Sequence, residues 1–194
     1  MNQEKTTYIK FFAPVVPETI NALMNVVDHK VIKEEIKHIV LLISTPGGNV
    51  FHGLSAYNYL KGLHIKVTTH NFGSADSIGS VLFCAGEERL SVPHARFLLH
   101  GVQMSINQNI AFEEDQLDEK LKSLRIDVRN ISKVIADTTG KNIDKVVEDM
   151  RKRTTLNPEE AKEYGLVQEI RSELYPEGAD VVSIQFESQP SPQK

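Results

Sequence analysis

The chain has 194 residues, of which 40% are hydrophobic and 25% are charged, and its formal net charge is -4. This is the composition of a globular domain with an ordinary core, and it excludes a disordered, collagen-like or low-complexity chain. The acidic balance gives no electrostatic footprint for nucleic acid, and no stretch is long and apolar enough to span a membrane. A single cysteine, Cys84, leaves no internal disulfide, and the polar N-terminus lacks the pattern of a signal peptide, so we expect a cytoplasmic protein.

The first third of the chain alternates between patterns typical of strands and of helices. The expected strands are 8–15, 39–43 and 65–69, and the helices between them begin at Pro17 and at Val50. The run 39–43 is apolar throughout, which is typical of a strand covered on both faces in a parallel sheet. This alternation predicts an α/β layered fold built from repeated βαβ units.

The remainder adds shorter elements and one long helix. The further elements that we expect are a helix at 78–85, short strands at 89–92 and 95–100, helices at 112–137, 143–150 and 158–164, and strands at 166–170 and 181–186. We expect a single domain over 1–186, followed by a disordered tail at 187–194.

The helix at 112–137 carries a narrow apolar seam on a charged surface. Its members recur at spacings of 4, 3, 4, 3 and 4: Leu117, Leu121, Leu124, Val128, Ile131 and Ile135. Such a seam is typical either of a helix that packs against a second copy of the chain or of one that covers its own core.

Three features follow predicted strands and should therefore meet at one edge of the sheet, where ligands of parallel sheets gather. They are the Pro-Gly-Gly loop at 46–48, the turn around Ser77, and His100. A serine at a strand-to-helix junction can act as a nucleophile when a histidine takes its proton, and the amides of Gly48 and Ile78 can stabilise an oxyanion. The same turn also fits a plain helix cap at Asp76 or Ser77.

Four motifs occur in a fixed order along the chain. They are Ser-Thr-Pro-Gly-Gly at 44–48, Gly-Ser-Ala-Asp-Ser-Ile-Gly at 73–79, Pro-His-Ala-Arg-Phe-Leu-Leu-His at 93–100, and Pro-Glu-Glu-Ala-Lys-Glu-Tyr-Gly-Leu-Val at 158–167. Together they resemble the motifs of the Clp protease proteolytic subunits, the ClpP family, from the first strand to about Ile170.

The resemblance implies a crotonase-like fold with a protruding long helix. It also implies a serine endopeptidase that cleaves peptides or unfolded polypeptides through an acyl-enzyme, inside a ring-shaped homo-oligomer. The family pattern places the nucleophile at Ser77, the general base at His100 and the oxyanion hole at the amides of Gly48 and Ile78. It implies no cofactor, and the other histidines show no spacing typical of metal ligands.

The third triad member departs from the family pattern. Family members carry an aspartate three residues before the leucine that corresponds to Leu156, and Arg153 stands there. An arginine cannot accept a hydrogen bond from an imidazole, so we expect impaired catalysis. Asp149, one helical turn earlier, is either a substitute or simply the partner of Arg153 in an i,i+4 ion pair.

Two other departures bear on function. Asp76 stands beside the nucleophile where the family usually has a small neutral residue, and its charge would oppose an oxyanion unless the side chain points away. The first strand begins within about eight residues of Met1, whereas family members usually carry a longer segment that helps to dock an AAA+ unfoldase. An ATPase partner is therefore in question.

Three alternatives remain open at this point. The first is a catalytically weak or inactive homologue that serves as a structural subunit of a mixed oligomer, as Arg153 suggests. The second keeps the fold but uses the two amides to stabilise a thioester enolate in an acyl-CoA enzyme. The third is a serine peptidase with a Ser-Lys dyad, with Lys120 or Lys122 as base.

Overall fold

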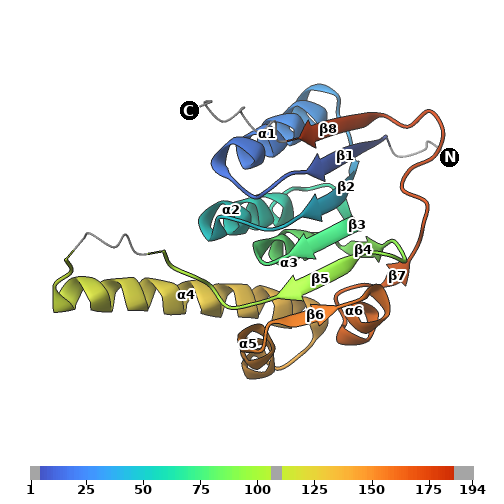
Figure 1. Ribbon diagram of the computed structural model, residues 1–194. Helices are drawn as coiled ribbons and strands as arrows, with labels where there is room; N and C mark the ends of the chain where they lie inside the picture. Colours follow the sequence, from blue (N-terminus) through green and yellow to red (C-terminus); the bar gives the residue numbers. More distant parts are fainter. Residues whose placement is uncertain (1–4, 106–110, 186–194) are drawn as a thin grey trace, which may run out of the picture.

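The computed structural model describes residues 5–105 and 111–185, and the tail expected at 187–194 lies outside the described residues. Within them the strands form one sheet in the order β6-β5-β3-β2-β1-β8, with β4 beside β3 and β7 beside β4 (Figure 1). The strands are β1 Thr6–Phe12, β2 His38–Thr45, β3 Lys66–Asp76, β4 Glu88–Ser91, β5 Arg96–Leu99, β6 Thr154–Leu156, β7 Glu169–Ile170 and β8 Val181–Gln185. Every pairing is parallel except that of β5 with β6. The predicted α/β class is confirmed.

The helices pack mainly on one face of this sheet (Figure 1). They are α1 Pro17–Asp28, a π-helical turn His29–Lys33, α2 Val50–Lys61, α3 Ile78–Phe83, α4 Glu114–Thr139, α5 Ile143–Arg151 and α6 Pro158–Tyr164. All five residues of the run 39–43 are buried, as a strand covered on both faces requires. Cys84 is also buried, and burial raises the pKa of its thiol to about 11, so this cysteine is part of the core.

Strand β3 is longer than the predicted strand 65–69 because it changes partners along its length. Residues 68–71 pair with β4, and residues 74–76 pair with β5. The sequence 71–76, which has the small and polar residues of a turn, is therefore the end of a strand. This extension carries Ser77 to the edge of the sheet beside the end of β5.

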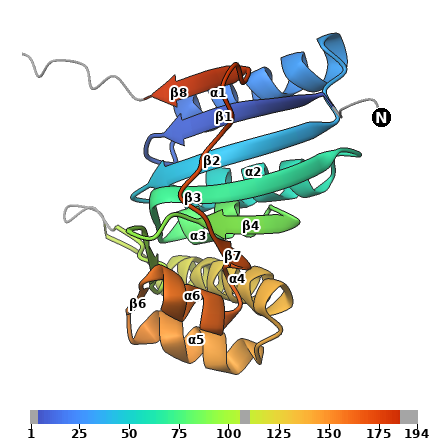
Figure 2. The same cartoon turned by 90° about the vertical axis from the view of Figure 1, so that its right-hand side faces the viewer.

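The face of the sheet opposite α1, α2 and α3 is crossed by the segment 171–180, which runs from β7 to β8 (Figure 2). Its carbonyl at Arg171 accepts a hydrogen bond from Nε2 of the buried His70 at 3.0 Å. At its other end, the Asp180 carboxylate accepts from Lys30 Nζ at 2.8 Å and from Thr7 Oγ1 at 2.6 Å. The segment is thus tied down at both ends.

Helix α4 extends well beyond the rest of the molecule (Figure 1). Its C-terminal half covers the core through the buried Ile131 and Ile135, whereas Leu117 and Leu121 in its N-terminal half are 48% and 42% exposed. The C-terminal half of α4 therefore covers the core of its own domain, whereas the exposed N-terminal half has the apolar surface expected of a contact with a second copy of the chain. Among the described residues, no helix combines the length and the apolar character needed to cross a membrane.

Candidate active site

Ser77 lies between the end of β3 and the start of α3 in a backbone conformation that is rare for a residue with a side chain. Its φ is 58° and its ψ is -128°. The conformation is held from both sides, because the Ser77 amide donates to the Leu98 carbonyl at 2.8 Å and the Ser80 hydroxyl donates to the Ala75 carbonyl at 2.7 Å. Ser77 occupies the N-cap position of α3, but its side chain makes no capping hydrogen bond. A strained turn that leaves its hydroxyl free of a capping role is typical of a functional position.

The Pro-Gly-Gly loop lies directly against this turn. Gly47 has a φ of 87°, and a Cβ built there would lie 2.6 Å from the Cβ of Ser77. Gly48 has a φ of 149°, and its Cβ would lie 2.2 Å from the carbonyl oxygen of Val15. Val15 holds the loop with two hydrogen bonds. Its amide donates to the Gly47 carbonyl at 2.8 Å, and its carbonyl accepts from the Asn49 amide at 2.7 Å. Only glycine fits at these two positions.

The amides of Gly48 and Ile78 border the same space as Ser77. Ile78 is the first residue of α3, where a backbone N–H has no partner inside the helix and the helix dipole favours negative charge. Both residues line one cavity of about 330 Å³ together with Ser77 and His100. We call this space the Ser77 cavity.

His100 follows β5 and lines the Ser77 cavity from the neighbouring strand end. The strand register explains this placement. Asp76 on β3 pairs with Leu98 on β5, so Ser77, one residue after Asp76, and His100, two residues after Leu98, leave neighbouring strand ends. Nδ1 of His100 lies 2.7 Å from the carbonyl oxygen of Gly101. Because a carbonyl only accepts, Nδ1 carries the proton, and in the neutral ring Nε2 is left as an acceptor.

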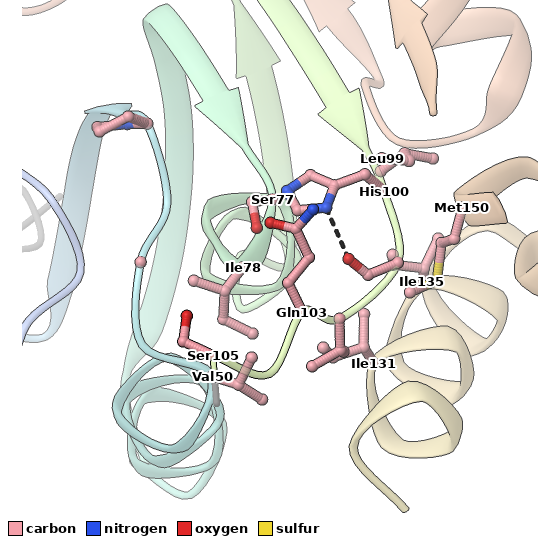
Figure 3. A pocket seen from close by; sticks show the side chains of 14 residues that line it. Val50, Ser77, Ile78, Leu99, His100, Gln103, Ser105, Ile131, Ile135 and Met150 are labelled. Atoms are coloured by element: carbon pink, nitrogen blue, oxygen red, sulfur yellow. Dashed lines mark hydrogen bonds between the residues drawn. The ribbon is translucent and has the colours of Figure 1, made fainter. Parts of the chain in front are cut away.

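The walls of the Ser77 cavity differ in character (Figure 3). Ser77, His100 and Gln103 lie at its polar end, whereas α4 contributes Ile131 and Ile135 to an apolar wall. A polar reacting end beside an apolar wall fits a chain that presents both a carbonyl and a hydrophobic side chain.

The position of the usual triad aspartate lies close to His100 in the sheet. Strand β6 runs antiparallel to β5 with Thr154 opposite Leu99, so that continuing the register by one residue sets Arg153 opposite His100. Arg153 is exposed and has a positive φ of 56°. The described hydrogen bonds include none between Arg153 and the His100 ring.

Asp149 is buried in α5 and has other partners. Its carboxylate accepts from Lys145 Nζ at 2.7 Å and from the Tyr164 hydroxyl at 3.0 Å. Burial, which is the larger effect, and the hydrogen bond to Asp149 both raise the pKa of the Tyr164 hydroxyl. The expected i,i+4 ion pair of Asp149 with Arg153 is wrong, because Asp149 pairs with Lys145, one turn before it.

The charge of Asp76 is directed away from the nucleophile. Its side chain lines a second cavity, which the Ser77 cavity adjoins at Pro46, and its Oδ2 lies 2.5 Å from Nη2 of Arg96. Opposite charge within hydrogen-bond distance offsets the field of the carboxylate at the site where an oxyanion would form.

Several residues of the Ser77 cavity were not singled out from the sequence. They are the carbonyl of Gly101 and the side chains of Gln103 and Ser105, which follow β5 without regular secondary structure. Polar residues in such a stretch look like any surface loop, and their only signal is their proximity to His100 in the sequence.

The two lysines considered as bases lie on the exposed half of α4. Lys120 Nζ is 4.9 Å from the centre of the Phe112 ring, and Lys120 lines a different cavity from Ser77. Within residues 5–105 and 111–185, no group of three or more histidine, cysteine, aspartate and glutamate side chains is placed to bind a metal ion.

Comparison with known proteins extends over most of the chain. The model of the Clp protease family matches residues 6–173. The chain is 30% identical over 155 residues to the ATP-dependent Clp protease proteolytic subunit of Chlorella vulgaris, which covers 79% of this chain and 75% of that protein. It is 33% identical over 141 residues to proteolytic subunit 3 of Rhodococcus jostii (strain RHA1), with 70% and 66% covered. It is 31% identical over 142 residues to proteolytic subunit 2 of Chlamydia trachomatis serovar D, with 72% and 68% covered.

The matched residues include the strained turn at Ser77, the Pro-Gly-Gly loop and His100. The chain therefore belongs to the Clp protease family.

Proposed function

We propose that this chain is a serine endopeptidase that cleaves peptides or unfolded polypeptides through an acyl-enzyme on Ser77. The observation that carries the proposal is the hydrogen bond from His100 Nδ1 to the Gly101 carbonyl at 2.7 Å. It leaves Nε2 as the basic nitrogen in the cavity that also contains the Ser77 hydroxyl.

The reaction then runs in two steps. Ser77 Oγ attacks the scissile carbonyl carbon while its proton passes to His100 Nε2, and the amides of Gly48 and Ile78 stabilise the resulting oxyanion. The tetrahedral intermediate collapses when the imidazolium gives its proton to the leaving amine. Water, deprotonated by the same Nε2, then attacks the acyl carbon, and the imidazolium returns the proton to Ser77 Oγ as the bond between the acyl carbon and Oγ breaks and the acid is released. The Gly101 carbonyl orients the ring throughout and replaces the usual carboxylate in that one respect.

Labelling with a fluorophosphonate probe tests the proposal directly. We expect one adduct per chain, lost in Ser77→Ala and strongly slowed in His100→Ala. Ser55→Ala is a matched control, since the Ser55 hydroxyl donates to the Phe51 carbonyl on α2, and it should label like the unmodified chain. Absence of an adduct under conditions that label a reference serine protease would contradict the proposal.

The second candidate is a weak or inactive subunit of a mixed oligomer, and Arg153 is the observation that favours it. A carbonyl fixes the imidazole tautomer but does not offset the positive charge that forms on the ring, and loss of the triad aspartate can lower turnover by about ten-thousandfold. Turnover of a fluorogenic peptide by the purified chain supports the peptidase. Labelling without turnover, together with co-purification of a second subunit that has a complete triad, supports the structural role.

Assembly is part of the proposal. The exposed apolar half of α4 supports contact with a second copy of the chain, and an oligomeric ring would enclose the Ser77 cavities. The names of the relatives describe them as ATP-dependent, so delivery of polypeptide by an AAA+ ATPase is an extension of this proposal. The single buried thiol fits a reducing, cytoplasmic setting.

A further inference from the structure

Beside the Ser77 cavity lies a second cavity of about 310 Å³, which we call the Asp76 pocket. Its apolar walls are Phe12, Ala13 and Pro14 from the end of β1, and Asp76 and Arg96 supply its charge. Pro46, in the loop that precedes Gly48, lines both cavities. The two cavities therefore adjoin each other at Pro46.

The hydrogen bonding of the Asp76 carboxylate in this pocket is incomplete. The Asp76 side chain is only 6% exposed, and its Oδ2 pairs with Arg96. Oδ1 is buried, and within the described residues it has no hydrogen-bond partner. A buried carboxylate oxygen without a donor is costly, and such groups in proteins usually have a partner.

The partner that fits is a cation brought by a ligand. A carboxylate has acceptor positions for two donors at once, so an ammonium can bind Oδ1 while Arg96 keeps Oδ2. The Arg96 side chain is 61% exposed and can shift to open the approach, whereas Asp76 is fixed at the end of β3. The apolar walls suit an aliphatic stem, and the exposed ring of Phe12 at 57% can lie along it.

We propose that the Asp76 pocket is a substrate subsite that selects a lysine side chain near the scissile bond of the polypeptide. This inference rests on the peptidase function proposed for Ser77 and adds a specificity to it. Asp76 would bind the lysine ammonium, and Arg96 would hold the carboxylate in place.

The test uses fluorogenic peptides in which each position around one cleavage site carries lysine, norleucine or glutamate in turn. Norleucine keeps most of the lysine stem without its charge. We expect the ratio of kcat/KM for lysine over norleucine to be about tenfold or more at one position, since a charge-assisted hydrogen bond has this magnitude. Glutamate at that position should be the poorest substrate.

Two variants should change this ratio in opposite directions. Asp76→Asn should reduce it to about one, because the ammonium loses its counter-charge. Arg96→Gln should raise it, because the carboxylate then loses the cation that neutralises it. The matched control is Asp137→Asn, which removes the carboxylate of an exposed ion pair with Lys133 and should leave the ratio unchanged. A merely structural Asp76–Arg96 pair would lower kcat/KM for all peptides alike in both variants, and this outcome overturns the proposal.

A binding measurement separates failure of the subsite from failure of the peptidase. Fluorescence polarisation of the same peptides with Ser77→Ala reports the preference without hydrolysis. Tighter binding of the lysine peptide, again lost with Asp76→Asn, supports the subsite even if the unmodified chain does not turn over. Hydrolysis with no preference for lysine at any position would overturn the subsite and leave the peptidase intact.

Discussion

Nδ1 of His100 donates to the carbonyl oxygen of Gly101, its own neighbour in the chain, at 2.7 Å. The imidazole is therefore oriented by the backbone, whereas the family pattern would use a carboxylate at position 153, immediately before β6. The two solutions differ electrostatically, because a carbonyl dipole stabilises an imidazolium less than a full negative charge does. The first two predictions follow from this difference.

Restoring the acidic residue should increase activity. Arg153→Asp puts a carboxylate opposite the end of β5, and aspartate tolerates the positive φ of 56° at this position better than arginine. We expect kcat to rise by about tenfold or more, with about ten-thousandfold as the upper bound. The matched control is Arg153→Asn, which has the same size and backbone preference but no charge. An equal gain in both variants would show that backbone relief, and not the carboxylate, is responsible.

Asp149 should act on stability and not on turnover. Asp149→Asn removes one charged acceptor shared by Lys145 and Tyr164, and the loss of such a buried partner costs about 1–3 kcal/mol of unfolding free energy. Thermal unfolding and peptide kinetics measured on the same sample check this. A fall in kcat of several orders of magnitude without a change in Tm would instead make Asp149 the third triad member.

The Pro-Gly-Gly loop should tolerate no side chain at its second glycine. Gly48→Ala places a Cβ 2.2 Å from the Val15 carbonyl, so the loop must move and carry its amide away from the oxyanion site. We expect kcat/KM to fall by about a hundredfold or more. Gly178→Ala is the control, since its φ of 74° is also positive but a Cβ there meets nothing within 4 Å. It should cost about 1 kcal/mol of stability and leave kinetics unchanged.

The stability of the chain should fall in mild acid because of His70. Burial is the largest effect and lowers the pKa of His70 below its ordinary value of 6.5. The hydrogen bond to the Arg171 carbonyl raises this pKa by less, and the charges of Arg171, which lowers it, and of Glu169, which raises it, have still smaller effects. The unfolded chain therefore binds a proton at a higher pH than the folded chain. The contribution of His70 is fully present above pH 6.5 and is lost as the pH falls from there through the folded pKa.

His70→Gln tests this, since its amide keeps a donor for the Arg171 carbonyl. Its Tm should depend less on pH between about 7 and 5 than that of the unmodified chain. Identical pH dependence of the two proteins would rule out His70 as the cause.

The exposed half of α4 should mediate self-association. Leu121→Lys places a charge in the apolar seam where Leu121 is 42% exposed, and we expect the dissociation constant of the oligomer to rise by about tenfold or more. Sedimentation velocity measures this. Ser123→Lys adds the same charge to the same helix outside the seam and should not affect association. A chain that is monomeric before mutation would contradict the prediction.

The sequence was sufficient to predict most elements and the family. The apolar strand 39–43 between two predicted helices indicated a parallel sheet. Short motifs at the ends of predicted strands indicated the region around Ser77 and His100. These signals are local in the chain. The extension of β3 to Asp76 was not predictable, because its small and polar residues are strand only through pairing with β5. The three residues of β6 are likewise defined by their partner.

Side-chain partners were predicted less well than positions. The spacing in the sequence predicted that Asp149 pairs with Arg153. In the structure, the Asp149 carboxylate instead binds Lys145 on the same helix and Tyr164 on α6. Similarly, the role of Asp76 depends on Arg96, which lies 20 residues later on the neighbouring strand. The contacts of Tyr164 and Arg96 join different elements and leave no periodic trace in the sequence, whereas Lys145 lies at the i,i+4 spacing that Arg153 also has from Asp149.

The segment 171–180 has a consequence for how the chain reaches this structure. It brings β8 to the open edge of β1, and the bond between Thr7 and Asp180 spans 173 positions of sequence. During synthesis, the first strand therefore waits for its second neighbour until nearly the whole domain has been made. Pairings between such distant segments form slowly, and an unpaired apolar strand edge invites association with other chains. The order of synthesis thus leaves one edge of β1 without its partner strand until β8 is in place.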